Sequence, residues 1–213
     1  LFYSVPDSLR PGEEIDKNPT TAHLVNATKV SGRTNGGLGV GILNAVSGAT
    51  FATVHDADGN RRKILTEPLT NYSVVVLDQQ LKNNNDIWFA NTNTIREGNW
   101  RDANVWSGGL KLEDKRHVAR VSGRFANSRI WQWQEADGNL SRQIKSGNQM
   151  SMSLEKISGK VQLGSNFEVG EKSFDKTDLG FIFINDYSDV NLFGSYNLFN
   201  PFWKGRFRQG FFN

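Results

Sequence analysis

The residues best placed to do chemistry are charged side chains that recur at alternate positions along otherwise apolar segments. Successive side chains of a β-strand point to opposite faces of a sheet, so alternate positions gather on one face. If that face lines a pore, its charges steer ions and anionic solutes; alternatively, they pair with carboxylates or hold a plug. The expected lumen-lining set is Lys111, Arg120, Arg124, Lys160, Glu168, Lys204, Arg206 and Arg208.

Tryptophans form the second notable set of residues. Aromatic girdles at the edge of a bilayer account for most of the 6 tryptophans. Trp131 and Trp133 differ, because they fall in a long predicted connection between strands. They are therefore the candidates for contacting a ligand outside the membrane.

Catalytic and metal-binding patterns are weak in this sequence. A hydrolase needs Ser or Thr beside a histidine with an orienting partner, and only His117 with Ser122 approaches this arrangement. The fragments Asp56–Asn60 and Asp137–Asn139 resemble calcium loops but lack the terminal bidentate glutamate. We therefore expect no enzyme activity, no metal and no cofactor, with an outer-membrane hydrolase kept as a remote alternative.

Segments of about ten residues alternate apolar with small or polar residues, with turn residues between them. A strand of ~9–11 residues spans a bilayer when tilted, whereas strands of globular proteins are nearer ~5–6 residues. The predicted strands are Ala22–Gly32, Gly36–Ala45, Leu69–Gln80, Asp86–Ile95, Asn104–Leu112, His117–Ser128, Asn148–Glu155, Lys160–Val169, Gly180–Tyr187, Val190–Leu198 and Trp203–Phe212.

Short turns alternate with long connections along the chain. The two long connections, 46–68 and 130–147, each contain an Asp-Gly pair, which predicts a projecting hairpin. Residues 1–21 are rich in proline and charge and are expected to form an extended loop segment. Tight turns on one rim and long loops on the other are typical of membrane barrels.

The composition excludes several classes of protein. The 213 residues are 37% hydrophobic, which is low for a globular domain, and no apolar run approaches the ~18 residues of a spanning helix. A net charge of +3 is too mild to indicate nucleic-acid binding. There is no cysteine and no leader pattern at Leu1, so we expect either a removed leader or an excerpt of a longer chain.

Several stretches resemble one known family in sequence and in order along nearly the whole chain. They are Phe2–Ser4, Lys29–Thr34, Gly37–Leu43, Glu67–Val74, Ser153–Gly159 and Phe174–Phe181. The chain resembles part of an outer-membrane β-barrel family of Bacteroidota, in which a carbohydrate-binding family 9-like domain precedes a barrel domain of unknown function. It departs from the family in lacking that first domain and in having Val5-Pro6-Asp7 where a basic stretch is usual. The resemblance implies no catalytic residues.

We therefore predict an all-β fold, an antiparallel transmembrane β-barrel of the outer-membrane type, as an incomplete portion of a larger barrel. Residues 22–213 would supply its strands and long extracellular loops. The expected function is transport, uptake or surface assembly in the bacterial outer membrane, linked to glycan recognition. Expected partners are the lipid bilayer, lipoproteins or other outer-membrane proteins, and no nucleic acid. The main alternative is a soluble, lectin-like all-β module.

Overall fold

The protein is an all-β structure, seen in a computed structural model that describes residues 9–136, 138–178, 185–200, 203, 206 and 208–212. These residues form two antiparallel sheets, one of ten strands and one of three. Among them, no helix has the length and apolar character needed to cross a membrane.

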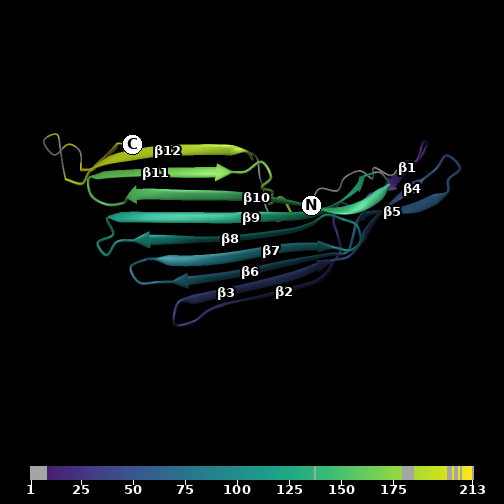
Figure 1. Ribbon diagram of the computed structural model, residues 1–213, viewed down its shortest axis with the longest axis horizontal. Helices are drawn as coiled ribbons and strands as arrows, with labels where there is room; N and C mark the ends of the chain where they lie inside the picture. Colours follow the sequence, from purple (N-terminus) through teal and green to yellow (C-terminus); the bar gives the residue numbers. More distant parts are fainter. Residues whose placement is uncertain are drawn as a thin grey trace.

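The large sheet is an antiparallel array in the order β13-β12-β11-β10-β9-β8-β7-β6-β3-β2 (Figure 1). Its strands are β2 (Leu24–Arg33), β3 (Leu38–Ser47), β6 (Thr70–Gln80), β7 (Asp86–Arg96), β8 (Asp102–Glu113), β9 (Ala119–Ala136), β10 (Asn139–Lys156), β11 (Val161–Gly170), β12 (Tyr187–Leu198) and β13 (Gly210–Phe212). Its edges, β2 and β13, do not pair with each other. The sheet is therefore open, and the expected barrel is not closed within the described residues.

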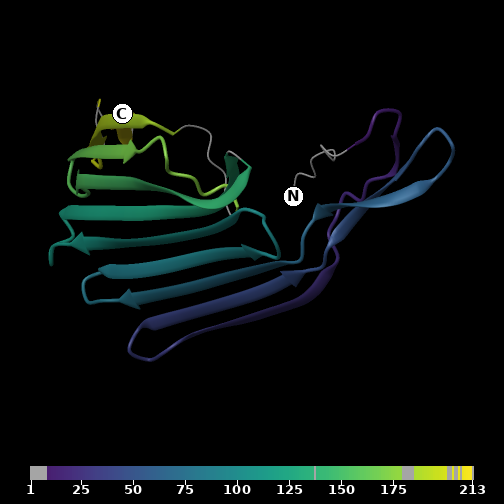
Figure 2. The same ribbon diagram turned by 45° about the vertical axis from the view of Figure 1, so that its right-hand side comes forward.

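The small sheet projects from one end of the large sheet (Figure 2). It contains β1 (Glu14–Lys17), β4 (Thr50–His55) and β5 (Arg61–Glu67) in the order β1-β4-β5. The hairpin β4–β5 is the one predicted for residues 46–68, and Gly59 takes the positive φ of 82° that its turn requires. β1 lies inside the segment 1–21, which was expected to be a loop.

Arg62 of β5 anchors the residue just before β1. Its Nε donates a 2.6 Å hydrogen bond to Glu13, whose side chain is only 7% exposed. This hydrogen bond from Arg62 is the main reason that the pKa of Glu13 falls to about 2. The N-terminal segment is thus held to the hairpin by a charged contact as well as by the strand pairing of β1.

Most strands follow the predicted segments to within a few residues, but β9, β10 and β13 do not. β9 and β10 each continue for 18 residues, so the hairpin predicted for 130–147 does form, as a direct extension of two sheet strands and not as a separate loop. Trp131 and Trp133 therefore lie on β9 and not in a loop. The predicted strand Gly180–Tyr187 lies mostly outside the described residues.

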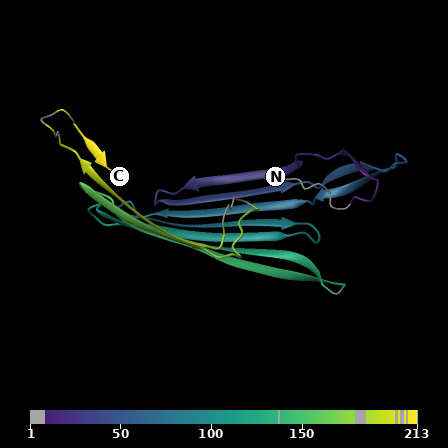
Figure 3. The ribbon, with the colours of Figure 1, turned by 90° about the horizontal axis from the view of Figure 1, so that it is seen from above.

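The large sheet forms a single curved layer, and Figure 3 shows it bent with the segment after β11 on its concave side. We name its two faces by their side chains. The charged face includes Arg120, Arg124 and Ser153, and it is the concave one. The apolar face includes Leu110, Val121, Phe125, Met152, Phe167 and Val190, which follow from the strand register.

Residues 171–178 form the segment that covers part of the charged face; we call it the inner segment. Phe174 is 1% exposed, and the backbone N–H of Asp175 donates to the hydroxyl of Ser128 on β9 (2.9 Å). A Cβ added at Gly147 would collide with the backbone of Ser173 and Phe174. Gly147 thus allows the inner segment to approach β10 closely.

We predict that Gly147→Ala destabilises the fold by about 1–3 kcal/mol, because overpacking forces the backbone of the inner segment away from β10. The measurement is the denaturant midpoint of the folded protein. Gly41→Ala is the matched control, because an added Cβ there meets only Val76 Cβ at 3.8 Å, an ordinary contact. Equal midpoints for the two variants would contradict this packing.

Candidate functional site

Four of the eight predicted charged residues meet on the charged face. Lys111 lies on β8, Arg120 and Arg124 lie on β9, and Glu168 lies on β11. In the sheet, β8 is next to β9, and β10 separates β9 from β11. One register row runs from Gly109 through Arg124 and Ser151 to Glu168. The alternation of the sequence thus gathers these charges as expected, although whether they line a lumen stays a prediction.

The other four predicted residues do not join this cluster. Lys160 is exposed and precedes β11. Arg206 and Arg208 are exposed outside any strand, because the chain turns there: Trp203 has a φ of 55°, and Arg206 N–H donates to the Trp203 carbonyl. Lys204 lies outside the described residues. Among the described residues of the predicted strand Trp203–Phe212, Gly210–Phe212 form a strand.

Two of the four gathered charges have partners of opposite charge. Arg120 donates to Glu113 at 2.8 Å and approaches Glu155 at 3.5 Å. Lys111 lies 3.6 Å from Asp86. These contacts favour the alternative in which the charges pair across neighbouring strands, and they leave fewer unpaired cations than the sequence pattern predicts.

Glu168 and Arg124 are held by neutral groups. Glu168 accepts hydrogen bonds from Gln149 (2.7 Å) and from the hydroxyl of Tyr187 (2.6 Å). Arg124 Nε donates to Ser151 Oγ at 3.1 Å. Among the described residues, Arg124 has no ion pair, so its charge faces the concave side uncompensated.

His117 and Ser122 each have a partner other than one another. His117 Nδ1 lies 2.8 Å from Glu113 Oε2, and Ser122 Oγ lies 2.6 Å from Ser153 Oγ. The two residues that the sequence suggested as a catalytic pair are therefore directed to different partners. No group of three or more metal-ligating His, Cys, Asp or Glu side chains occurs in the part of the chain that the structure describes.

The inner segment is tied to the connection between β7 and β8 by arginine–carboxylate pairs. Arg96 donates to Asp178 at 2.6 Å, and Arg101 donates to Asp178 at 2.7 Å and to Asp175 at 3.1 Å. Asp178 is 11% exposed at its side chain. One alternative left open by the sequence was that the lumen charges hold a plug; the arginines that hold this segment, Arg96 and Arg101, belong to the end of β7 and the connection after it.

The pKa of Asp175 is lowered in this setting. Burial by itself raises the pKa of this carboxyl group, but hydrogen bonds from Thr177 and the charge of Arg101 together outweigh burial. The carboxylate form is therefore the one that fits the docked inner segment.

The apolar face carries a row of asparagines that sequence analysis did not single out. Hydrogen bonds join their amides in pairs across neighbouring strands. The pairs are Asn44 with Asn71 (3.2 Å), Asn91 with Asn104 (3.4 Å) and Asn127 with Asn148 (2.9 Å). This asparagine row crosses the sheet from β3 to β10. The signal was present as asparagines at strand positions, where this residue type is normally depleted.

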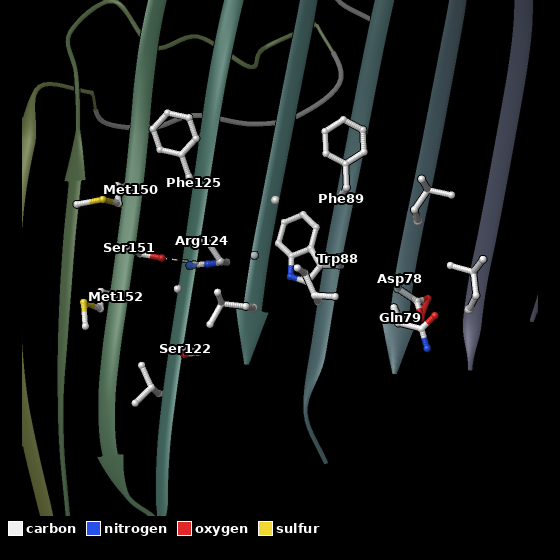
Figure 4. A pocket seen from close by; sticks show the side chains of 18 residues that line it. Asp78, Gln79, Trp88, Phe89, Ser122, Arg124, Phe125, Met150, Ser151 and Met152 are labelled. Atoms are coloured by element: carbon white, nitrogen blue, oxygen red, sulfur yellow. Dashed lines mark hydrogen bonds between the residues drawn. The ribbon is translucent and has the colours of Figure 1, made fainter. Parts of the chain in front are cut away.

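The asparagine row separates two parts of the apolar face. On one side lies an apolar band with a hollow of about 720 Å³, lined mainly by side chains such as Phe89, Phe125, Met150 and Met152 (Figure 4). On the other side, on the extended part of β9, lies Trp131, with the Arg142 guanidinium 5.8 Å from its ring centroid. The sheet thus changes from apolar to polar and aromatic along its strands.

Comparison with known proteins assigns the chain to a family without assigning an activity. A family model described as a domain of unknown function, DUF5916, matches residues 2–211. The chain belongs to this family. No curated protein and no solved structure matches the chain.

We predict that the inner segment undocks under acid conditions. Because the folded pKa of Asp175 is below the ordinary aspartate value, its stabilising contribution is full above about pH 4 and is lost as the pH falls through the lowered value. A spin label on Lys176→Cys should be restrained at pH 7 and become mobile as the pH falls below about 4.

Two variants complete this measurement. A spin label at Arg208→Cys, which is exposed and lies outside any strand, should remain mobile at every pH. Arg101→Gln should release the label at position 176 already at pH 7, since two of the ion pairs are removed. A label whose mobility is the same at pH 7 and in acid, with and without Arg101, would show that these pairs do not hold the segment.

Proposed function

We propose that this member of the DUF5916 family forms part of the wall of an outer-membrane β-barrel, with its apolar face in lipid and its charged face toward a water-filled interior. In this proposal the protein serves uptake, transport or surface assembly and has no catalytic role. The observation that carries the proposal is a ten-stranded sheet of one layer whose apolar face is uncovered.

The uncovered face is large and strongly apolar. Many large apolar side chains on it are 37–76% exposed, with Leu192 at the upper limit. A folded soluble domain rarely leaves an apolar patch larger than ~300–600 Å² in water, and burial of apolar surface is worth about 25 cal/mol per Å². Some apolar phase must therefore contact this face.

Lipid suits this face better than a second protein sheet, because of what borders the band. At one edge lie the tight turns that follow β2, β6, β8 and β10, which are polar. At the other edge lie the asparagine row and then Trp131. Membrane barrels have this order, an apolar band between polar or aromatic girdles, with a polar interior on the opposite face.

The open edges support a barrel larger than the described sheet. Every residue of β2 is exposed, and an exposed edge strand presents unpaired N–H and C=O groups that need a partner in lipid. Further strands of the same protein, or a second outer-membrane protein, would supply that pairing. Partner lipoproteins belong to the same proposal, as expected from the sequence.

The proposed interior is partly filled by the inner segment. Transport through such a barrel would require this segment to move or to leave a side passage. A link to glycan recognition, an origin in Bacteroidota and a carbohydrate-binding domain elsewhere in the protein rest on the sequence resemblance. Trp131 and Trp133 would then lie near the membrane interface on β9.

We predict that two adjacent residues of β10 differ in accessibility. The chain contains no cysteine, so single cysteines can be placed at Met152 on the apolar face and at Ser153 on the charged face. In membranes containing the full-length protein, a water-soluble maleimide should label Ser153→Cys and leave Met152→Cys unlabelled. Denaturation in detergent should make both residues reactive.

The same variants test the soluble, lectin-like alternative. A particle that stays in solution without detergent, with Met152→Cys shielded by a second copy of the chain, would replace the membrane proposal by a sandwich of two sheets. Labelling of Met152→Cys by the water-soluble reagent in membranes would also overturn it. Crosslinking between copies, measured alongside the labelling, separates these two results.

A further inference from the structure

We infer that the charged face holds a binding site for a sugar ring that carries a carboxylate or phosphate group, with Arg124 as the anion-binding residue and Trp88 as the ring-binding residue. This inference rests on the proposed function in one respect, since it names what the water-filled interior would bind. It is carried by the geometry around β8, where two hollows meet.

Arg124 supplies an uncompensated cation with free donor capacity. Only its Nε is engaged, by Ser151 Oγ at 3.1 Å, and no carboxylate in the described part of the chain lies within ion-pair distance of it. The terminal nitrogens of a guanidinium bind carboxylate or phosphate through two parallel hydrogen bonds. Arg124 therefore presents an anion-binding group that the neighbouring strands do not neutralise.

Trp88 supplies a flat apolar surface beside that cation. Gly109 of β8 pairs with both Trp88 and Arg124 in the register, so the two side chains flank a position that has no side chain. A Cβ at Gly109 would lie 2.7 Å from Trp88 Nε1, which shows that the indole lies against the backbone there. Figure 4 shows Trp88 and Arg124 on the two sides of β8.

Two hollows on the charged face share Trp88, Arg124 and Ser151. One of about 280 Å³ is also lined by Ser153 and Asn166, and one of about 300 Å³ reaches the inner segment. Each is at the lower limit of the ~300–1,000 Å³ of small-molecule sites. This size suits one ring, and the hydroxyl and amide groups of the lining suit the hydroxyl groups of a sugar.

The balance of charges in these hollows favours an anion. Lys111 is compensated by Asp86 at 3.6 Å, and Glu168 is occupied by Gln149 and Tyr187. Lys176 of the inner segment lines the larger hollow and has no ion pair among the described residues. Arg124, Lys176 and Glu168 therefore remain without ion pairs, so the larger hollow, which all three line, has one positive charge in excess.

The test uses the purified full-length protein in detergent and follows tryptophan fluorescence during titration with D-glucuronate. D-glucose (the neutral ring) and acetate (the anion without a ring) are the comparison probes. We expect saturable binding of glucuronate and at least tenfold weaker binding of the other two. Arg124→Gln should weaken glucuronate binding at least tenfold, because charge-assisted hydrogen bonds are lost.

Three further variants keep the inference falsifiable. Arg206→Gln, which alters an exposed residue outside the strands, should leave binding unchanged. Trp88→Ala should weaken binding. Trp88→Phe should retain most of the binding but lose the fluorescence change, so binding to this variant is measured by calorimetry. Unchanged thermal unfolding of Arg124→Gln separates loss of the site from loss of the fold.

Several results would overturn the inference. They are equal binding of glucose and glucuronate, binding of acetate as strong as that of glucuronate, and unaltered binding by Arg124→Gln. If phosphorylated glucose binds and glucuronate does not, the site is restricted to phosphorylated sugars. The titration tests the binding site, and the cysteine labelling tests the membrane proposal. Each experiment can fail without affecting the result of the other, so the two proposals are tested separately.

Discussion

The antiparallel register of the ten-stranded sheet is the constraint on which the rest of the structure depends. Side chains alternate between faces with a period of two, so a slip of one residue between neighbouring strands would exchange their faces. From β7 to β12 one register row on the apolar face contains only apolar residues and a glycine, namely Ile87, Leu110, Gly123, Met152, Phe167 and Val190. Short turns hold this register.

The turn between β8 and β9 shows how a local interaction fixes the register. Asp114 accepts hydrogen bonds from the backbone N–H groups of Val118 (2.5 Å) and Ala119 (2.8 Å), and these bonds lower the pKa of its carboxyl group. One aspartate thus satisfies the backbone where β9 begins. Arg120 then falls opposite Glu113, so that the first charged pair of the face is set by the geometry of the turn.

The sequence predicted the strands because the period-two alternation is local, and it predicted the hairpin β4–β5 because an Asp-Gly pair marks its turn. The same signal predicted the hairpin at 130–147, but not that it continues β9 and β10, because the outer parts of these strands contain Arg129, Trp131 and Trp133 on one face and no continuous apolar stripe. The sequence also missed the ties of the inner segment. Arg96 and Asp178 are 82 residues apart, and an ion pair between distant residues leaves no periodic signal. The unpaired state of Arg124 likewise depends on register across strands.

The asparagine row and the inner segment mark the same level on the two faces of the sheet. Asn127 and Asn148 belong to the row, while their chain neighbours Ser128 and Gly147 contact the inner segment on the opposite face. Below this level the wall is apolar outside and charged inside; above it, β9 and β10 continue as a polar and aromatic hairpin. In the proposed barrel, a wall that changes character on both faces at one height has its boundary with the lipid headgroups there. This assigns the inner segment to the outer mouth of the proposed interior and places the site around Arg124 below it.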